Sequence, residues 1–212
     1  MENMNVFREF EYHLMNDIRP SEYFDHILEN TELFEEYPLT MLADLADSEQ
    51  SPEHHPEGNV WRHTMMVVDN AAERRSESRD PRVFMWAALL HDLGKAPTTR
   101  IRKGRITAYG HDIEGEKMTQ AFLREYTDDE DFIYKTSKLV RWHMQILFVA
   151  RDMPFADIGS MAMQTSIDEV ALLSLCDRLG RGGMGEDKEK EERHNVDVFL
   201  KKTREYLRSR KT

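Results

Sequence analysis

Several features common in proteins are scarce or missing in this chain of 212 residues. It has one cysteine, Cys176, so no intrachain disulfide can form, which fits a reducing compartment. No glycine precedes Gly58, which excludes a glycine-rich phosphate loop from the first part of the chain. No apolar run approaches the ~20 residues that span a bilayer, and the N-terminus has no signal-peptide pattern. We therefore expect a cytoplasmic protein without membrane association.

The composition is that of a folded globular domain. Hydrophobic residues make up 40% of the chain and charged residues 33%, which separates it from disordered sequences. The length is sufficient to bury a substantial core. The formal net charge of −11 argues against a broad nucleic-acid-binding face. It does not argue against a small anionic ligand held at a locally positive site.

Apolar residues recur at spacings of three and four along most of the chain, which predicts an all-α fold. One segment differs, because residues 98–110 alternate around Lys103 and Gly104 and predict a short β-hairpin near 99–108. The glycine-rich and then highly charged segment 181–193 is interpreted as a mobile loop. The expected helices span 4–18, 21–29, 38–46, 60–76, 81–93, 112–126, 129–149, 156–163, 167–180 and 194–209.

Four polar residues fall on or beside the helical stripes that should face the core: His63, His91, His143 and Asp177. A single buried histidine is usually an ordinary core residue. A buried aspartate is more costly, because an unpaired carboxylate in an apolar setting costs several kcal/mol or more. Asp177 and Asp92, which follows His91, each require a cation. Lys95 and Arg178 could provide salt bridges, but three histidines and two aspartates converging on one core favour a metal ion.

These residues carry a resemblance to a known family. The order His63, His91-Asp92, Asp177 on separate helices resembles the HD superfamily of metal-dependent phosphohydrolases. Four stretches resemble most closely the HD domain of bacterial CCA-adding tRNA nucleotidyltransferases and related poly(A) polymerases: HHPEGNVWRHT (54–64), AALLHDLGKAPTT (87–99), YGHDIEGE (109–116) and LVRWHM (139–144). The resemblance covers roughly residues 35–181 and implies an HD-type helical bundle.

The chain also departs from that family in two ways. No signal of a nucleotidyltransferase head precedes the HD region, so we expect a free-standing HD protein and do not carry over CCA addition. Asn59 stands where the family usually has an acid, which we interpret as an altered helix cap. We expect one compact domain with three parts: a helical N-terminal extension over 1–50, the HD metal-binding core over 51–182, and a mobile charged loop with a C-terminal helix over 183–212.

The resemblance implies roles for individual residues. The four metal ligands of the superfamily match His63, His91, Asp92 and Asp177. His111 and His143 match the histidines that hold a second ion in some members, although His111 could instead bind phosphate or cap a helix. The implied cofactor is a divalent ion (Mn, Fe, Co, Ni, Zn or Mg), with one or two per chain. We assign catalysis to Asp92, Lys95 and His111, and binding of the substrate phosphate to Lys95, Arg62 and Arg181.

The turn HHPEG, which contains His54, His55 and Glu57, is either a lip over the site or a rigid turn. Cys176 lies about 100° around its helix from Asp177 and is interpreted as buried packing, neither ligand nor nucleophile.

Together these features predict an enzyme. It would hydrolyse phosphate esters of nucleotides, either 2′,3′-cyclic phosphodiesters or nucleotide phosphomonoesters, by attack of a metal-bound hydroxide. The expected partner is a small phosphorylated molecule, in particular a nucleotide, or an RNA end. The alternative is a non-catalytic HD module that binds a nucleotide or RNA. A weaker third possibility is a metal-stabilised structural partner of a separate nucleotidyltransferase.

Overall fold

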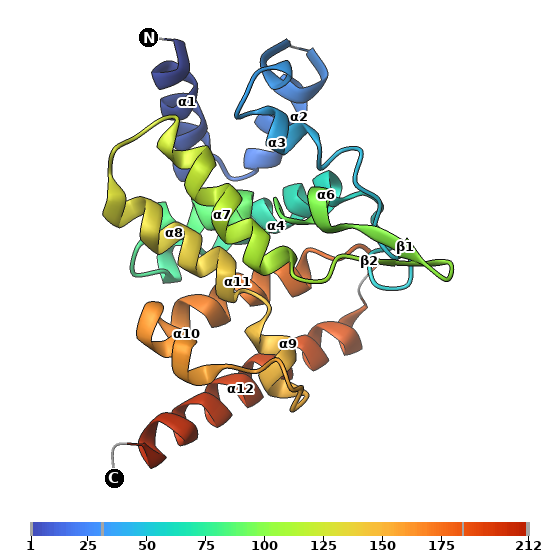
Figure 1. Cartoon of the computed structure of the whole chain (residues 1–212), viewed down its shortest axis with the longest axis vertical. Coiled ribbons are helices and arrows are strands. Elements are labelled where there is room, and N and C mark those ends of the chain that lie inside the picture. The colour runs from blue at the N-terminus through green and yellow to red at the C-terminus, as the bar shows by residue number, and fades with distance from the viewer. Residues whose placement is uncertain (1, 31, 184, 211–212) are drawn as a thin grey trace.

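A computed structural model describes residues 2–30, 32–183 and 185–210 of the chain. It is a helical bundle with one small β-hairpin, which confirms the predicted fold class (Figure 1). None of the described helices has the length and apolar character needed to cross a bilayer. The α-helices are α1 (Glu2–Asn16), α2 (Pro20–Asn30), α3 (Thr40–Ala43), α4 (Val60–Arg74), α5 (Pro81–Leu90), α6 (Lys95–Thr98), α7 (His111–Arg124), α8 (Glu130–Trp142), α9 (Gln145–Ala150), α10 (Ile158–Gln164), α11 (Ile167–Leu179) and α12 (Glu186–Ser209). Two short 3-10 helices lie at Glu32–Glu35 and Arg75–Glu77.

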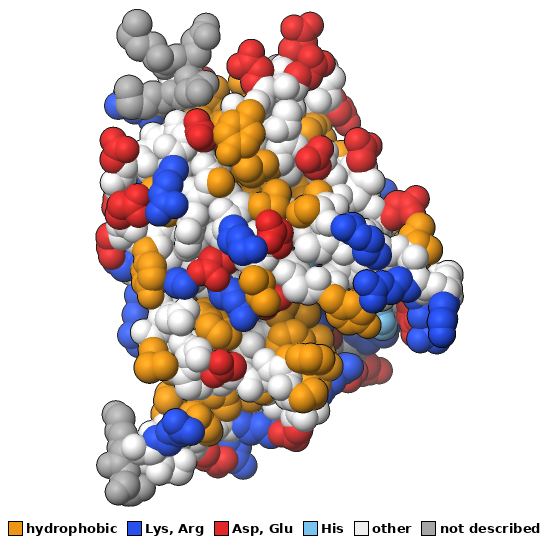
Figure 2. Space-filling view, in the orientation of Figure 1, with side chains coloured by type: hydrophobic (Ala, Val, Ile, Leu, Met, Phe, Trp, Pro, Cys, Tyr) orange, Lys and Arg blue, Asp and Glu red, His pale blue; other side chains and the backbone are white. Residues whose placement is uncertain are grey.

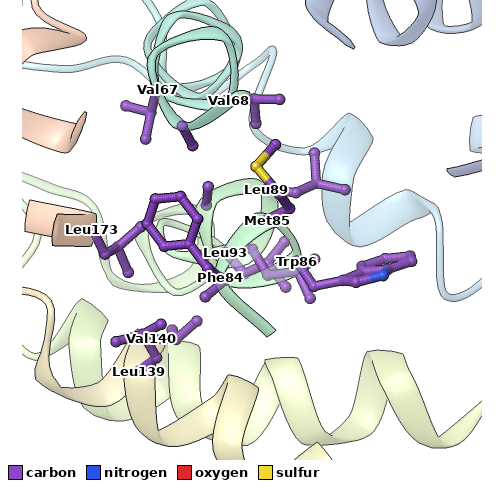
Figure 3. Packing of buried hydrophobic residues seen from close by; sticks show 14 of the residues in the cluster. Val67, Val68, Phe84, Met85, Trp86, Leu89, Leu93, Leu139, Val140 and Leu173 are labelled. Carbon is purple, nitrogen blue, oxygen red and sulfur yellow. The ribbon is translucent and has the colours of Figure 1, made fainter. Parts of the chain in front are cut away.

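Helix α5 runs through the centre of the bundle and packs against α1, α4, α8 and α11. Asp80 caps its first turn by accepting a hydrogen bond from the Val83 amide, and Pro81 occupies the first helical position, where no amide donor is needed. Every residue from Val83 to Leu90 is buried, as expected for a helix that is apolar all round. Figure 3 shows α5 side chains packed between Val67 and Val68 of α4 on one side and Leu139 and Val140 of α8 on the other. The end of α5 therefore lies deep inside the molecule.

The N-terminal helices α1 and α2 pack against α5 and α4 through aromatic side chains. Phe7 of α1 stacks on Trp86 of α5 with ring centroids 4.7 Å apart. The indole nitrogen of Trp86 lies 3.3 Å from a carboxylate oxygen of Glu11, and that of Trp61 donates to Asp25 of α2 at 2.7 Å. Helices α1 and α2 consequently complete the core over α4 and α5.

The hairpin consists of β1 (Arg100–Arg102) and β2 (Arg105–Thr107), paired antiparallel as the alternation predicted. Lys103 and Gly104 form the turn and both have positive φ, as a type I′ hairpin turn requires. The hairpin projects from the bundle at the right of Figure 1.

Three predicted elements differ from the structure. The helix expected over 38–46 is reduced to α3, and the one expected over 129–149 is divided into α8 and α9 at His143 and Met144. The mobile loop expected over 181–193 is wrong from Glu186 onward, because α12 begins there and continues to Ser209. Met184 lies outside the described residues. Oppositely charged residues four apart, such as Glu189 and Arg193 at 2.7 Å, support the exposed first turns of α12.

The turn after α5 lies against the start of α7, and this close approach requires glycine. A Cβ on Gly94 would lie 2.0 Å from the carbonyl oxygen of His111 and 2.6 Å from the amide nitrogen of Gly115. On the other side, Gly115 lies against Val140 of α8. Glycine at position 94 thus permits residues 91 and 92 to approach His111.

We expect Gly94→Ala to destabilise the fold by about 1–3 kcal/mol, because backbone atoms cannot yield as a flexible side chain would. For a chain of this size, that corresponds to a fall in Tm of roughly 2–12 °C. Gly185→Ala is the control, because a Cβ there meets nothing within 4 Å. Thermal unfolding measures both, and equal Tm values for the two variants would contradict the close-approach argument.

Candidate metal centre

The polar residues singled out in the sequence come together where several helices meet. His63 lies on α4, His91 is the C-cap of α5 and precedes Asp92, and Asp177 lies on α11. Two more histidines join them at helix ends: His111 is the first residue of α7, and His143 is the C-cap of α8. All six residues are buried. The structure thus brings together all of the predicted ligands.

Asp92 lies at the middle of the cluster. One of its oxygens, Oδ2, is 3.2 Å from His91 Nε2 and 3.7 Å from His63 Nε2. His63 Nε2 is also 3.0 Å from Asp177 Oδ1, which joins α11 to the group. The ligand atoms of His63, His91 and Asp92 all lie within 4.8 Å of one another, a spacing that one ion can span.

The other oxygen of Asp92 faces a second pair of imidazoles. Oδ1 is 3.7 Å from His111 Nε2 and 4.0 Å from His143 Nε2. The two imidazole nitrogens are 3.2 Å apart, and these three residues again place their ligand atoms within 4.8 Å of one another. Asp92 therefore lies between two potential ion positions, with one carboxylate oxygen directed to each.

The protonation pattern of the histidines fits a metal. Nδ1 of His91, His111 and His143 lies within 2.8 Å of the carbonyl oxygen three residues earlier, at Ala88, Ala108 and Val140 respectively. A carbonyl oxygen can only accept, so each Nδ1 carries a hydrogen, and a ring in its neutral form then presents a lone pair at Nε2. His91 Nε2 has no hydrogen-bond partner although it is buried. Two lone pairs also face each other between His111 and His143, and a cation would satisfy them.

The pKa values of His143, His111 and Asp92 favour neutral imidazoles beside an ionised carboxylate. Burial, together with the neighbouring His111 and His91, lowers the pKa of His143 to about 4. Burial also lowers the pKa of His111, so both rings are neutral near pH 7. Burial alone would raise the pKa of Asp92, but its interactions with His91 and Lys95 outweigh burial, and the pKa falls well below its usual value. His111 and His143 therefore offer neutral imidazole nitrogens beside the Asp92 carboxylate, a donor set that suits a divalent ion.

Glu57 is a residue of the site that the sequence reasoning did not select. Its side chain retains only 2% exposure, and Oε1 lies 3.0 Å from His63 Nδ1 and 2.8 Å from His55 Nδ1. Its other oxygen accepts the Gly182 amide at 3.0 Å. The HHPEG segment forms a turn, and this turn also contributes a carboxylate to the cluster. It holds a carboxylate against the far side of the His63 ring, which leaves Nε2 facing Asp92 and Asp177.

The predicted phosphate-binding residues differ in their positions. Lys95 Nζ lies 2.7 Å from Asp92 Oδ2 and donates to Gln50 at 2.6 Å, so it is at the cluster. Arg181 is half-buried, its Nε has no hydrogen-bond partner, and its charge contributes to the low pKa of Asp177. Arg62 is exposed, and its backbone amide donates to the Asn59 side chain that caps α4. The geometry therefore supports Lys95 and Arg181 more strongly than Arg62.

Of the two buried aspartates, Asp92 and Asp177, only Asp92 has the salt bridge that the sequence offered as an alternative to a metal ion. Lys95 does pair with Asp92. Arg178 instead has its Nε 3.1 Å from Glu192 Oε2 of α12, and Asp177 faces His63.

Cys176 is buried as expected, and burial raises the pKa of its thiol to about 12, so it remains protonated. Asn59 caps α4 by accepting the Arg62 amide at 2.9 Å, which confirms its interpretation as a helix cap.

The fold and the cluster define a class of protein: a helical bundle in which histidines and aspartates from separate helices converge on a buried site for divalent ions. A family model described as HD domain matches residues 60–182, more than half of the chain. The chain belongs to the HD domain family, a family of metal-dependent phosphohydrolases.

Curated relatives place this HD domain near one group of proteins. A Multifunctional CCA protein from Actinobacillus pleuropneumoniae serotype 5b is 35% identical over 86 residues, which cover 39% of this chain and 20% of the relative. Another from Azoarcus sp. (strain BH72) is 49% identical over 140 residues, which cover 63% of this chain and 32% of the relative. A third, from Aromatoleum aromaticum, is 51% identical over 49 residues, which cover 23% of this chain and 11% of the relative. The chain thus spans a third or less of the length of these relatives, and the HD domain is related to theirs.

Proposed function

We propose that this protein is a metal-dependent phosphohydrolase acting on phosphate esters of nucleotides, either 2′,3′-cyclic phosphodiesters or phosphomonoesters. The observation that carries the proposal is the position of Asp92 between two groups of buried imidazoles whose Nε2 atoms face inward. The resemblance of the ligand-bearing motifs to the HD domains of CCA-adding enzymes supports nucleotides as the substrate class.

The residues divide into two ligand groups around Asp92. His63, His91, Asp92 and Asp177 would hold one divalent ion, and Asp92 with His111 and His143 would hold a second. When bound, such ions lower the pKa of a coordinated water and neutralise charge on phosphoryl oxygens.

The chain's own residues determine how a substrate approaches. Most ligand side chains are fully buried, but those of His111 and Asp177 retain 10% and 8% exposure, and the neighbouring Lys95 retains 12%. The cluster therefore opens to solvent at these residues. Lys95 pairs with Asp92, and the charge of Arg181 acts on Asp177, so these two cations would bind the non-reacting phosphoryl oxygens. The hydrogen bond that His111 Nδ1 donates to the Ala108 carbonyl oxygen fixes the His111 ring at this opening, and the apolar core around α5 excludes water from the remaining sides.

The test is a hydrolysis panel on protein stripped with a chelator and then reloaded with Mn, Co, Ni or Mg. Substrates are 2′,3′-cyclic nucleotides, 2′-, 3′- and 5′-mononucleotides and an aryl phosphate. We expect phosphate or ring-opened product at least about 100-fold faster with metal than without, since the ions supply several kcal/mol of charge stabilisation. Tight nucleotide binding without product under every metal would overturn the proposal and favour the binding module.

A further inference from the structure

The hairpin next to the cluster concentrates positive charge that the fold does not use. No acidic residue lies between Asp92 and Asp112, whereas Lys95 and four hairpin residues in this interval are basic. These four residues, Arg100, Arg102, Lys103 and Arg105, are all exposed. None of the four forms an ion pair with any residue that the structure describes. Figure 2 shows Lys and Arg side chains gathered at this edge of the molecule, at the right of the view. The concentration is notable in a chain of net charge −11.

The pairing of the strands places three arginines on one face. Arg102 is directly opposite Arg105, and Arg100 is opposite Thr107, so all three arginine side chains share a face of the two-stranded sheet. Like charges directly opposite each other destabilise a β-ladder. With no carboxylate to neutralise it, the Arg102–Arg105 pair opposes hairpin formation, and an external polyanion would relieve the repulsion.

The hairpin is anchored to the metal centre at both ends. Its first strand follows Asp92 through the short helix α6, and its second strand leads to Ala108, whose carbonyl oxygen lies 2.8 Å from His111 Nδ1. Tyr109 lies between the hairpin and His111 and is 76% exposed. An exposed aromatic ring beside a basic ribbon is the combination that binds unpaired bases and their phosphates.

We infer that the face formed by Arg100, Arg102 and Arg105, together with Tyr109, binds a single-stranded nucleic acid and leads its phosphorylated end to the metal cluster. The arginines contact successive backbone phosphates and Tyr109 stacks on a base near the end. The surface thereby selects oligonucleotides over free mononucleotides. This inference deepens the proposed function, but strand binding is independent of hydrolysis.

The test measures binding of a fluorescent single strand of about 12 nucleotides, a typical site size, with a 3′-phosphate, by anisotropy on the full chain. We expect Arg102→Glu/Arg105→Glu to weaken binding about 10-fold or more. The double variant should also flatten the dependence of log K on log salt by about 1.4, which is 0.7 per lost phosphate contact. Lys188→Glu/Lys190→Glu is the matched control, because both lysines are exposed and lie on α12. Equal weakening by the control would overturn the inference.

Tyr109 is tested separately, because stacking does not depend on charge. We expect Tyr109→Ala to weaken binding roughly 5- to 100-fold and Tyr109→Phe to retain it, as for stacked bases elsewhere. Tyr12→Ala, at another exposed tyrosine of 60% exposure, should have no effect. A Tyr109→Ala variant that binds like the unchanged chain would remove the stacking role and overturn the inference.

Two further measurements distinguish strand binding from hydrolysis, and a nucleic acid from a membrane surface. Metal-dependent hydrolysis of mononucleotides should be unchanged in Arg102→Glu/Arg105→Glu, so a failure of strand binding is distinguishable from a failure of the proposed activity. Vesicles of phosphatidylserine and phosphatidylcholine test the other large polyanion. Vesicle binding that depends on the same arginines, without oligonucleotide binding, would overturn the inference in favour of a membrane surface.

Discussion

Replacing Asp92 by asparagine is expected to abolish most metal binding and hydrolysis. The change keeps the size of the side chain but removes its charge and turns one ligand oxygen into an amide nitrogen. Since the two oxygens of Asp92 face different imidazole groups, either orientation of the amide deprives one group of its carboxylate ligand. Loss of an outer-shell partner already costs 10–100-fold, so we expect at least about 100-fold in metal affinity and in metal-dependent hydrolysis.

Thermal stability gives a second readout that needs no substrate. At a free metal concentration of 100 times Kd, binding stabilises the folded state by about 2.7 kcal/mol, which raises Tm by roughly 5–11 °C for a chain of this size. The Tm of the Asp92→Asn variant should not rise when the metal is added. Asp112→Asn is the control, because Asp112 is also buried but pairs with Arg141 outside the cluster. Retention of metal by Asp92→Asn, or equal loss in Asp112→Asn, would contradict the assignment.

The sequence predicted the parts of the site that lie in periodic structure. His63 and Asp177 lie within helices, and His91 and His143 directly follow the last residues of α5 and α8. Each could be placed at the core because the apolar residues of its helix define a stripe. The hairpin was predictable from its alternation around Lys103 and Gly104.

Glu57 could not be found in this way, because it lies in a turn, where no periodicity indicates which side chains are buried. Its burial depends on Gly182, more than a hundred residues later, where a Cβ would approach the Glu57 side chain to 2.9 Å. Contacts between two loops at such a separation leave no local pattern.

The limits of the helices were missed for a related reason. Apolar residues continue past His143 to Val149, so the pattern does not show that the helix ends there. The imidazole of His143 instead bonds back to Val140 at the helix end, and Ser174 of α11 donates to the His143 carbonyl at 2.6 Å. Tertiary contacts thus end α8 at the position where its histidine is required.

Replacing Glu57 by glutamine is expected to weaken metal binding about 10–100-fold, as removal of a carboxylate behind a ligating histidine generally does. Glu57 accepts from Gly182 and faces the Nδ1 atoms of His63 and His55. Glutamine has only one accepting oxygen for these partners, so its amide nitrogen would face a donor. Titration of metal at pH 8 into the metal-free protein measures the effect. Glu53→Gln, at an exposed position of the same loop, is the control and should bind as tightly as the unchanged chain.

The dependence of metal binding on pH separates a positioning role from a general loss of structure. Burial lowers the pKa of His63, but the hydrogen bonds that its ring donates to Asp177 and Glu57 outweigh burial, and the pKa is raised. A metal must displace the proton from Nε2, so affinity is lost as pH falls through this raised pKa. Without the Glu57 charge the pKa of His63 falls, and the pH at which binding is half lost should shift downward in Glu57→Gln. A variant with weaker binding but an unchanged midpoint would show that Glu57 acts only through the fold, because a structural defect has no reason to alter the proton affinity of one imidazole.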